Sequence, residues 1–407
     1  PPTCPPLSIL KVDPPDRAGA ETFGSSIVSS TRGGLLQDDV TDDLIFVGAP
    51  GQTDLFGNDS QGIVYVYKVS RVSGDVTLTT EIRNDDLESG IFGRVNAISK
   101  DANLFATTIG KIISSPTVGD ETCIQVFEAN DNEDYDSIGS PVCEAGGFGA
   151  SISSATGIIR QGGDDPYTAG WVVVGAPLSR KIYFVKKPLL GTIFVKSEFK
   201  QDDKGFGNSV AIYQVVPNFV KLGADKIDYI AVASGIGAGS GGAVHFYYND
   251  DGSWNYPSWK YLTKKTNPSP LFGSDLAITK GTDVYSYFII VADPGNAAYV
   301  YEMNVSSPRT VQFKAKLTSA LIGNGERFAT SVAIRNGYVV ISSEKNFKTG
   351  NSYVFAFDGE SWNEKGAVDG EGSSIMYLNG GLVTKTSDWQ GILSFNYMKI
   401  ADVCTDV

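Results

Sequence analysis

Histidine, the commonest general base, and cysteine, a strong nucleophile, are scarce in this 407-residue sequence, with one and four residues. Histidine occurs once, as His245 in the stretch AVHFYYN, where alternating aromatic residues predict a β-strand. A packed histidine in that strand is the simpler interpretation, and a general base is the alternative. Neither GxSxG nor HExxH occurs, so no motif supports a serine hydrolase or a zinc protease.

Adjacent carboxylates are the second candidate for chemistry. They occur at Asp85-Asp86, Asp164-Asp165 and Asp202-Asp203. Hydrolysis of a glycosidic bond requires two carboxyl groups about 5 to 10 Å apart across the sugar. Neighbouring residues of a strand point to opposite faces, so adjacency alone does not make such a pair. A catalytic pair would need carboxylates that converge from different parts of the chain.

A glycine-rich stretch, SGIGAGSGG at 234–242, is the third candidate, because it contains a loosely spaced GxGxxG. Dinucleotide binding requires such glycines to follow a strand and to open a helix. Here they join two predicted strands, so a flexible loop is the better interpretation. We expect no nucleotide cofactor at this position.

The composition argues against two kinds of partner. The net charge is −13 and the pI is about 4.6, whereas nucleic-acid binding depends on clustered Lys and Arg. No apolar stretch approaches the roughly 18 residues of a membrane helix, so we expect no membrane insertion. With 46 glycines and 11% aromatic residues, the chain favours many short strands joined by tight turns.

The elements that would position these side chains form an internal repeat. Openings such as FGSSIVSS, with an aromatic residue, a small residue and a short strand, begin near 23, 92, 148, 206, 272 and 328, and a seventh near 372 lacks the aromatic residue. A nearly all-apolar strand such as LIFVGAP follows, and then one with alternating aromatic residues such as GIVYVYKV. A more polar strand such as TVQFKAKL closes most units. This period predicts a repeat architecture.

The change in hydrophobicity across each unit predicts where its strands lie. Strands buried on both faces read as continuous apolar runs, whereas outer strands alternate apolar with polar residues. We therefore expect an all-β chain that folds as a seven-bladed β-propeller of four-stranded antiparallel blades, in one domain over residues 1–407. The seventh unit ends after its third strand. We expect LSILKV at 7–12 to supply the outer strand of the last blade and to close the ring.

The four cysteines fit this arrangement as two disulfides. Cys4 and Cys404 flank the two strands expected to pair at the seam, so a bond between them would lock the ring. Cys123 and Cys143 are equally distant from a turn near Glu133, so a bond between them would join the two strands of one hairpin. Four free buried thiols are the alternative.

Two glycosylation sequons point to the same cellular location as the disulfides. They are Asn58-Asp59-Ser60 and Asn304-Val305-Ser306, with Asn58 and Asn304 as the expected attachment sites. Disulfides persist in oxidising compartments. The sequence therefore predicts a secreted or cell-surface protein.

The FG openings combined with the later VGAP resemble the FG-GAP repeat, the propeller unit of integrin alpha-subunit heads and of many secreted or cell-surface proteins. The pattern is literal in the first unit, with LIFVGAP, and in the third, with WVVVGAP, and it is softened in the others. The resemblance covers residues 7 to 400 and implies a seven-bladed propeller. It says less about function, because propellers host binding, structural and enzymatic roles.

The same resemblance raises the question of calcium. In integrin heads some repeats carry a DxDxDGxxD loop between the first two strands, and its oxygen atoms coordinate Ca²⁺. This sequence departs from that pattern, although QDDVTDDL offers Asp38, Asp39, Asp42 and Asp43 as a weak Ca²⁺ site in the first unit. Solvated acidic turns are the alternative, there and in the corresponding loops of other units.

Loops on a rigid scaffold are where recognition residues gather. The loop at 51–61, between the second and third strands of the first unit, presents Asp54, Leu55 and Phe56 as ligand contacts, with packing on the next blade as the alternative. We expect a non-enzymatic extracellular adhesion, recognition or structural module that binds a protein or glycan through the loops on one face of the propeller. One form of this hypothesis makes the module part of a larger surface or filament assembly. The alternative is a carbohydrate-active propeller enzyme, of lyase or dehydratase type, that uses face carboxylates and Tyr.

Overall fold

The computed structural model describes the strands of every repeat and many of their connections. The described residues are 23–31, 42–50, 62–70, 75–83, 92–99, 102–109, 117, 119–130, 134–159, 167–187, 195–215, 229–237, 241–249, 259–335, 337–345, 350–370, 375–378, 381–387 and 393–399. Every helix or strand element assigned among them is a strand. Within this part of the chain, no helix is long and apolar enough to cross a membrane.

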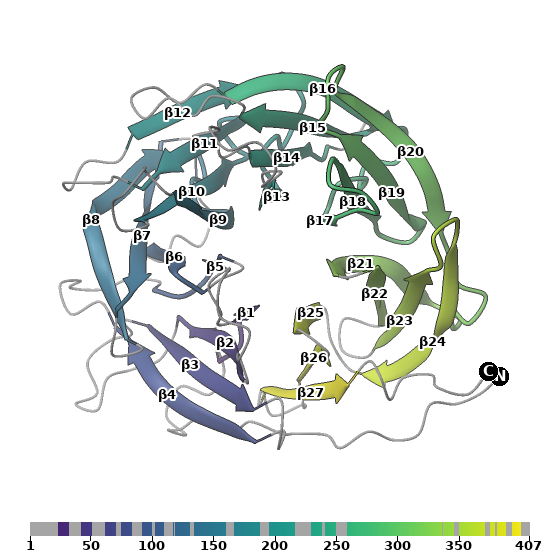
Figure 1. Cartoon of the computed structure of the whole chain (residues 1–407), viewed down its shortest axis with the longest axis horizontal. Coiled ribbons are helices and arrows are strands. Elements are labelled where there is room, and N and C mark those ends of the chain that lie inside the picture. Colours follow the sequence, from purple (N-terminus) through teal and green to yellow (C-terminus); the bar gives the residue numbers. More distant parts are fainter. Residues whose placement is uncertain are drawn as a thin grey trace.

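Each repeat places its strands in sequence order from the axis of the ring outward (Figure 1). The first, innermost strands are β1 (Ser26–Thr31), β5 (Asn96–Ile98), β9 (Ser151–Ile159), β13 (Val210–Gln214), β17 (Leu276–Lys280), β21 (Glu326–Arg335) and β25 (Ile375–Leu378). The second strands are β2 (Asp42–Ala49), β6 (Leu104–Ile109), β10 (Tyr167–Ala176), β14 (Tyr229–Gly235), β18 (Ser286–Asp293), β22 (Tyr338–Lys345) and β26 (Gly381–Ser387). The third strands are β3 (Ile63–Ser70), β7 (Glu121–Ala129), β11 (Lys181–Lys186), β15 (Gly242–Asn249), β19 (Ala297–Asn304), β23 (Gly350–Phe357) and β27 (Leu393–Lys399). The fourth, outermost strands are β4 (Val76–Ile82), β8 (Tyr135–Ala145), β12 (Val195–Lys200), β16 (Trp259–Asn267), β20 (Thr310–Leu317) and β24 (Trp362–Gly370).

These strands form a β-propeller, as the repeat predicts. Neighbouring strands in each sheet are antiparallel, and β1 contacts both β5 and β25, so the first and last sheets lie side by side. The prediction of seven four-stranded blades is wrong for the described residues, which form six four-stranded blades and a three-stranded sheet, β25-β26-β27. The last repeat ends after its third strand, and residues 7–12, expected to complete it, lie outside the described part of the chain.

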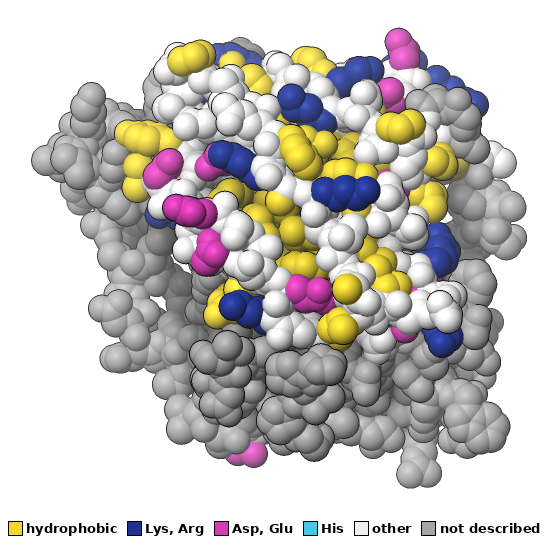
Figure 2. Space-filling view, turned by 90° about the vertical axis from the view of Figure 1, so that its right-hand side faces the viewer, with side chains coloured by type: hydrophobic (Ala, Val, Ile, Leu, Met, Phe, Trp, Pro, Cys, Tyr) yellow, Lys and Arg dark blue, Asp and Glu magenta, His cyan; other side chains and the backbone are white. Residues whose placement is uncertain are grey.

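Burial follows the predicted gradient from the axis outward. Every residue of the second strands β6, β14 and β18 is buried, because these strands lie between neighbours within their sheet and between adjacent blades. The outer strand β20 is mostly exposed, and its Phe313 is 55% exposed. On the side of the ring near β20 and β24, hydrophobic side chains lie among basic ones at the surface (Figure 2).

In five blades the Phe that opens the repeat packs most closely on one particular ring of the third strand in its own blade. The ring centroids are 4.9 to 5.6 Å apart in five blades, in the pairs Phe23–Tyr65, Phe148–Tyr183, Phe206–His245, Phe272–Tyr299 and Phe328–Tyr353. The same register recurs in these five blades. In the first blade, the residue four positions after Phe23 is Ile27, which pairs with Val47 of the second strand, and Val47 pairs with Tyr65 of the third strand. The corresponding residues pair in the same way in the other four. His245 therefore occupies the position that Tyr holds in four other blades.

The glycine of VGAP lies where the next blade approaches most closely. A Cβ atom added to Gly48 would lie 1.8 Å from the carbonyl oxygen of Gly93, and one added to Gly175 would lie 1.9 Å from that of Gly207. Gly93 and Gly207 belong to the FG turns of the following blades and have φ values of 84° and 93°, which glycine adopts without steric cost. FG and GAP are therefore the two sides of one backbone contact between blades.

One of the two predicted disulfides is present. Cys123 and Cys143 are bonded, they lie opposite each other on β7 and β8, and their Cα atoms are 4.0 Å apart. Cys4 and Cys404 lie outside the described residues, so the seam disulfide stays a prediction.

Candidate functional site

The innermost strands enclose a cavity on the axis of the ring, which we call the axial channel. Its volume is about 700 Å³, within the range of about 300 to 1,000 Å³ that is typical of small-molecule pockets. The described lining residues come from β1, β5, β9, β13, β17 and β21 and from the turns that follow the last two. They stand four to nine positions after the opening Phe, so the repeat determines which side chains line the channel.

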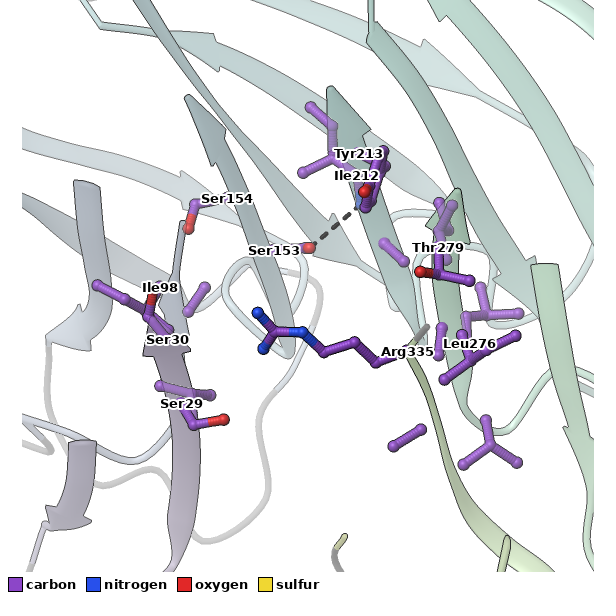
Figure 3. A pocket seen from close by; sticks show the side chains of 18 of the residues that line it. Ser29, Ser30, Ile98, Ser153, Ser154, Ile212, Tyr213, Leu276, Thr279 and Arg335 are labelled. Carbon is purple, nitrogen blue, oxygen red and sulfur yellow. Dashed lines mark hydrogen bonds between the residues drawn. The ribbon is translucent and has the colours of Figure 1, made fainter. Parts of the chain in front are cut away.

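The two halves of the channel wall differ in chemistry (Figure 3). β1, β5 and β9 contribute polar as well as apolar residues; the polar ones are Ser29, Ser30, Asn96, Ser153 and Ser154. On β13, β17 and β21 the wall is mainly apolar, with Ala211, Ile212, Leu276, Ala277, Ile278, Val332, Ala333 and Ile334. A ligand with hydroxyl groups on one side and C–H groups on the other would match both halves.

The serine hydroxyls also connect neighbouring blades. Ser30 Oγ donates to the carbonyl oxygen of Ser99 at 2.6 Å, and Ser153 Oγ accepts from the backbone N–H of Ile212 at 3.2 Å. A hydroxyl has one donor and two acceptor sites, so the bond from Ile212 leaves the O–H of Ser153 able to turn towards a ligand. The polar half of the wall is thus held in place by the fold.

Positive charge is concentrated at one end of the axial channel. Arg335 ends β21 and Lys280 ends the adjacent inner strand β17, and no carboxylate is present among the described lining residues. The Arg335 side chain extends into the channel (Figure 3). The chain as a whole has a charge of −13, so two cations in a concave site are a local exception. This end of the channel is suited to an anion.

Tyr213 lies on β13 near the two cations. Burial raises the pKa of its hydroxyl, and the charges of Arg335 and Lys280 act in the opposite direction, as does a hydrogen bond from the backbone N–H of Lys280. Its ring packs on Tyr287, with the centroids 5.6 Å apart. Its pKa is raised from an ordinary value already well above neutral pH, so Tyr213 is protonated there and has a proton to donate.

A half-buried carboxylate holds together the two strands that carry the cations. Asp275 Oδ2 accepts from Ser331 Oγ at 2.7 Å and from the backbone N–H of Val332 at 2.9 Å, across the boundary between two blades. Burial raises the pKa of Asp275, and these hydrogen bonds oppose that increase. The contact sets β21 against β17, and thereby sets Arg335 relative to Lys280.

Sequence reasoning did not identify these channel residues. It placed recognition in the loops between second and third strands, whereas Lys280 and Arg335 lie at the opposite ends of the blades, beside the turns from first to second strands. The signal was present in the aligned repeats, because FGSDLAITK and FATSVAIR end in a basic residue where FGSSIVSST ends in hydroxyls. The expected contacts Asp54, Leu55 and Phe56 lie outside the described residues.

The expected Ca²⁺ ligands are only partly described. Asp43 is buried on β2, the side chain of Asp42 is not described, and Asp38 and Asp39 lie outside the described residues. No group of three or more His, Cys, Asp or Glu residues that could hold a metal is found in the part of the chain that the structure covers. Calcium binding in this loop stays a prediction.

His245 is a buried residue of β15, in agreement with the simpler interpretation. Its side chain is 0% exposed, and its Nε2 lies 2.8 Å from Asp203 Oδ2. Because a carboxylate only accepts, Nε2 carries the proton of the neutral imidazole. Lys264 Nζ is 3.7 Å from the same Asp203 oxygen. The pair anchors the connection between β12 and β13 to the third strand of the fourth blade.

The buried His245 predicts a pH dependence of stability. Burial lowers its pKa, although Asp203 opposes this effect, so the unfolded chain takes up a proton below about pH 6.5 that the folded protein takes up only at lower pH. The free energy of unfolding should therefore fall by up to about 1 kcal/mol between pH 7 and pH 5.5 through this group. His245→Tyr, the residue used in four other blades, should remove that part of the decrease in urea unfolding curves. Equal decreases in both proteins would contradict this role.

Comparisons with known proteins identify other proteins with this fold but no family to which the chain belongs. No protein-family model matches the chain, and no curated protein matches it either. A protein from Bacteroides uniformis provisionally named 6-phosphogluconolactonase is 9% identical, with 84% of this chain and 93% of that chain covered and a TM-score of 0.50. The periplasmic gluconolactonase of Pseudomonas aeruginosa is 12% identical, with 82% and 84% covered and a TM-score of 0.46. Trypanosoma rangeli sialidase is 11% identical, with 98% and 59% covered and a TM-score of 0.49.

At these identities the similarity shows the propeller fold alone, and no match shows membership in the FG-GAP repeat family. The prediction that the chain is not an enzyme is nevertheless corrected, because the Bacteroides uniformis protein, provisionally named as an enzyme, shares the propeller fold, so this fold gives no ground for excluding catalysis. The physical reason is that a ring of blades leaves a concave axial site where side chains from several blades can converge.

Proposed function

We propose that this protein is a carbohydrate-active enzyme that binds an acidic sugar in the axial channel. The observation that carries the proposal is the placement of Arg335, with Lys280, in a channel that has a hydroxyl-bearing half and an apolar half. A sugar carboxylate would pair with the guanidinium group, which can hold it through two parallel hydrogen bonds. The hydroxyl groups of the sugar would face the serines, and its C–H groups would face β13, β17 and β21.

The lining residues favour elimination over hydrolysis. Glycoside hydrolysis by the usual route uses two carboxyl groups of the enzyme, and none is present among the described lining residues. Elimination beside a carboxylate instead needs a cation on that carboxylate, a proton acceptor and a proton donor. Arg335, Lys280 and Tyr213 supply these three kinds of group. The carboxylate that takes part in this reaction belongs to the substrate. The sequence-based alternative instead assigned that role to Asp or Glu side chains on a face of the propeller.

The proposed step can be written in full for a uronic acid residue within an oligosaccharide. Lys280 Nζ releases one of its own protons to solvent and then accepts the proton from C5, the carbon beside the carboxylate. The electron pair of that C–H bond forms the C4–C5 double bond as the C4–O bond breaks. Tyr213 donates its proton to the departing oxygen, and Arg335 stabilises the negative charge that develops on the carboxylate. The products are an unsaturated uronate and a shortened sugar chain.

The experiment is an incubation with oligosaccharides of galacturonate or glucuronate, beside neutral gluco-oligosaccharides of the same length. We expect cleavage of an acidic series only, with an unsaturated product detected by mass and by ultraviolet absorbance. Tyr213→Phe should reduce turnover about 10²-fold or more while acidic sugar binding is retained. Cleavage of the neutral series, or cleavage of an acidic series that is unchanged in Tyr213→Phe, would refute the proposed mechanism.

We also propose that the chain works outside the cytoplasm, which the Cys123–Cys143 disulfide supports. Asn304 ends β19, and its Oδ1 accepts from the backbone N–H of Ser306 at 2.8 Å and from Ser306 Oγ. This Asx turn presents the sequon in the connection between two strands. Expression through a eukaryotic secretory pathway should attach a glycan to Asn304, detected as a mass that Asn304→Gln removes. An unmodified Asn304 in the secreted protein would contradict this assignment.

Residues 7–12 remain the proposed fourth strand of the last sheet, with Cys4 bonded to Cys404. The three-stranded sheet β25-β26-β27 and its contact with β1 support this proposal, because every other repeat has four strands. A peptide map under non-reducing conditions should recover the two cysteines in one linked pair. A free thiol at either cysteine would exclude the seam disulfide.

A further inference from the structure

We infer that a second site for an acidic sugar chain lies on the outside of the ring, across the outer strands of the fourth and fifth blades. We call it the rim patch, and it comprises Tyr248, Lys260, Arg309, Phe313 and Lys316. This inference rests on the proposed function for its ligand class and adds a separate place where the same polymer is held. On the side of the ring near β20, hydrophobic and basic side chains lie side by side (Figure 2).

Phe313 gives the rim patch an uncovered apolar surface. Its side chain is 55% exposed, the highest value among the exposed large hydrophobic residues that the structure describes. Its ring centroid lies 5.8 Å from that of Tyr301 and 6.4 Å from that of Tyr299. Both tyrosines belong to the apolar core shared by the fourth and fifth blades, against which Tyr248 also packs. The rim patch is therefore the outer edge of that core, with one aromatic ring open to a ligand.

Three cations lie over aromatic rings of this edge. Lys260 Nζ is 5.8 Å and the guanidinium carbon of Arg309 is 4.1 Å from the centre of the Tyr248 ring. Lys316 Nζ is 5.8 Å from the centre of the Tyr299 ring. The quadrupole of each ring attracts the cation above its face. The fold therefore holds these charges at defined places on the rim.

Along β20, Phe313 lies between two of the cations. Arg309 directly precedes the strand and Lys316 is its seventh residue, so they stand roughly 20 Å apart along an extended chain. Lys316 donates to Asn296 Oδ1 at 3.3 Å, and its ammonium group has two more protons to donate to an anion. A chain of uronic acids would place carboxylates at both ends of the patch and a sugar ring on Phe313.

The strands of the rim patch are basic. β15, β16 and β20 contain five lysines and no Asp or Glu, although the net charge of the chain is −13. On β16, Lys264 lies 3.7 Å from Asp203, and on β20, Lys314 pairs with Glu302 at 2.6 Å, but neither lysine belongs to the patch. Glu302 lies opposite Phe288, which packs in the core on the other face of the blade. An anion at the rim patch therefore meets positive charge.

A uronic acid chain matches the rim patch better than an acidic peptide does. The C–H groups of a sugar ring form a flat apolar face that lies well on Phe313, while the carboxylate on the same ring reaches a cation. A peptide carries its carboxylates on flexible side chains, and ordering them on binding costs free energy. We expect the rim patch to hold a polymer on the protein while the axial channel acts on its sugars.

The test is calorimetric titration of the double variant Tyr213→Phe, Arg335→Gln, so that neither cleavage nor tight binding in the axial channel contributes. The probes are tetragalacturonate, D-galacturonate, a neutral gluco-tetraose and tetraglutamate. We expect tetragalacturonate to bind at least about 10-fold tighter than each of the other three. If any of them binds as tightly as tetragalacturonate, the rim patch does not recognise an acidic sugar chain and the inference is wrong.

Phe313→Ala and Leu78→Ala, each added to the double variant, form a matched pair. Leu78 is 40% exposed and lies across from Tyr67 in the first blade. Phe313 has the same position across from Tyr301. Phe313→Ala should weaken binding of tetragalacturonate about 10-fold, and Leu78→Ala should leave it unchanged. Both variants should keep the unfolding curve of their parent, and equal affinities in the two would overturn the placement of the site.

The rim patch and the axial channel can fail separately. If the double variant no longer binds tetragalacturonate although the wild type does, the rim patch is not a sugar site and the channel stands. If Arg335→Gln binds D-glucuronate with wild-type affinity while Phe313→Ala weakens binding of tetragalacturonate, the proposed function of the channel fails and the rim patch stands.

Discussion

Alanine at position 48 should destabilise the protein by about 3 kcal/mol or more, the largest effect that we expect from a single added carbon atom. The Cβ atom of Gly48→Ala would lie 1.8 Å from the carbonyl oxygen of Gly93 and 2.9 Å from its carbonyl carbon. Both atoms belong to the backbone of the next blade, so no rotation of a side chain can relieve the overlap. The free energy of unfolding in urea or guanidinium measures the loss.

The matched control is Gly119→Ala. Gly119 is exposed, and the atom nearest to a Cβ there is Thr117 Oγ1 at 4.0 Å. This variant should unfold within about 0.5 kcal/mol of the wild type. Gly175→Ala repeats the test at the other literal GAP motif, where the added atom would lie 1.9 Å from the carbonyl oxygen of Gly207. Wild-type stability of Gly48→Ala would show that the blades are not held at the spacing described.

Loss of the guanidinium group of Arg335 should weaken binding of D-glucuronate by roughly 10- to 100-fold. A hydrogen bond to a charged group contributes about 1.5 to 3 kcal/mol, and the channel shields the contact from water. Arg335→Gln keeps a polar side chain in the channel but removes the charge. Arg335→Lys keeps the charge but cannot donate two parallel hydrogen bonds, so its affinity should lie between those of Arg335→Gln and the wild type. Calorimetric titration at one fixed salt concentration measures the three Kd values.

Arg83→Gln is the control for an arginine outside the channel. Arg83 follows the outer strand β4 and pairs with Glu81 at 2.6 Å, away from the residues that line the axis. Its removal should leave the affinity for glucuronate unchanged. If Arg335→Gln also binds glucuronate with wild-type affinity, the cation end of the channel is not the carboxylate site.

Much of the fold could be predicted from the sequence because its signals are local and repeated. The FG openings recur with an apolar second strand after each, and burial of that strand between blades is what such runs indicate. The partners of the opening Phe could not be read in this way, because Tyr65, Tyr183 and Tyr353 lie 25 to 42 residues downstream. The role of His245 became visible only when these rings proved to share one register position.

The candidate site was harder to predict because no repeat contains it. Tyr213, Lys280 and Arg335 belong to three different blades, and closure of the ring brings them to one channel. Sequence motifs are recognised within one loop or repeat, so the prediction fell on acidic residues of a single loop, such as Asp38 and Asp39, and not on residues from three blades.

A crystal structure of the protein with bound D-glucuronate tests the central claim most directly. We predict that the sugar lies in the axial channel with its carboxylate within hydrogen-bonding distance of the Arg335 guanidinium group and its ring between the serine-bearing and apolar halves of the wall. A sugar bound instead on the loops at the opposite face of the propeller, with Arg335 not in contact with it, would contradict the account.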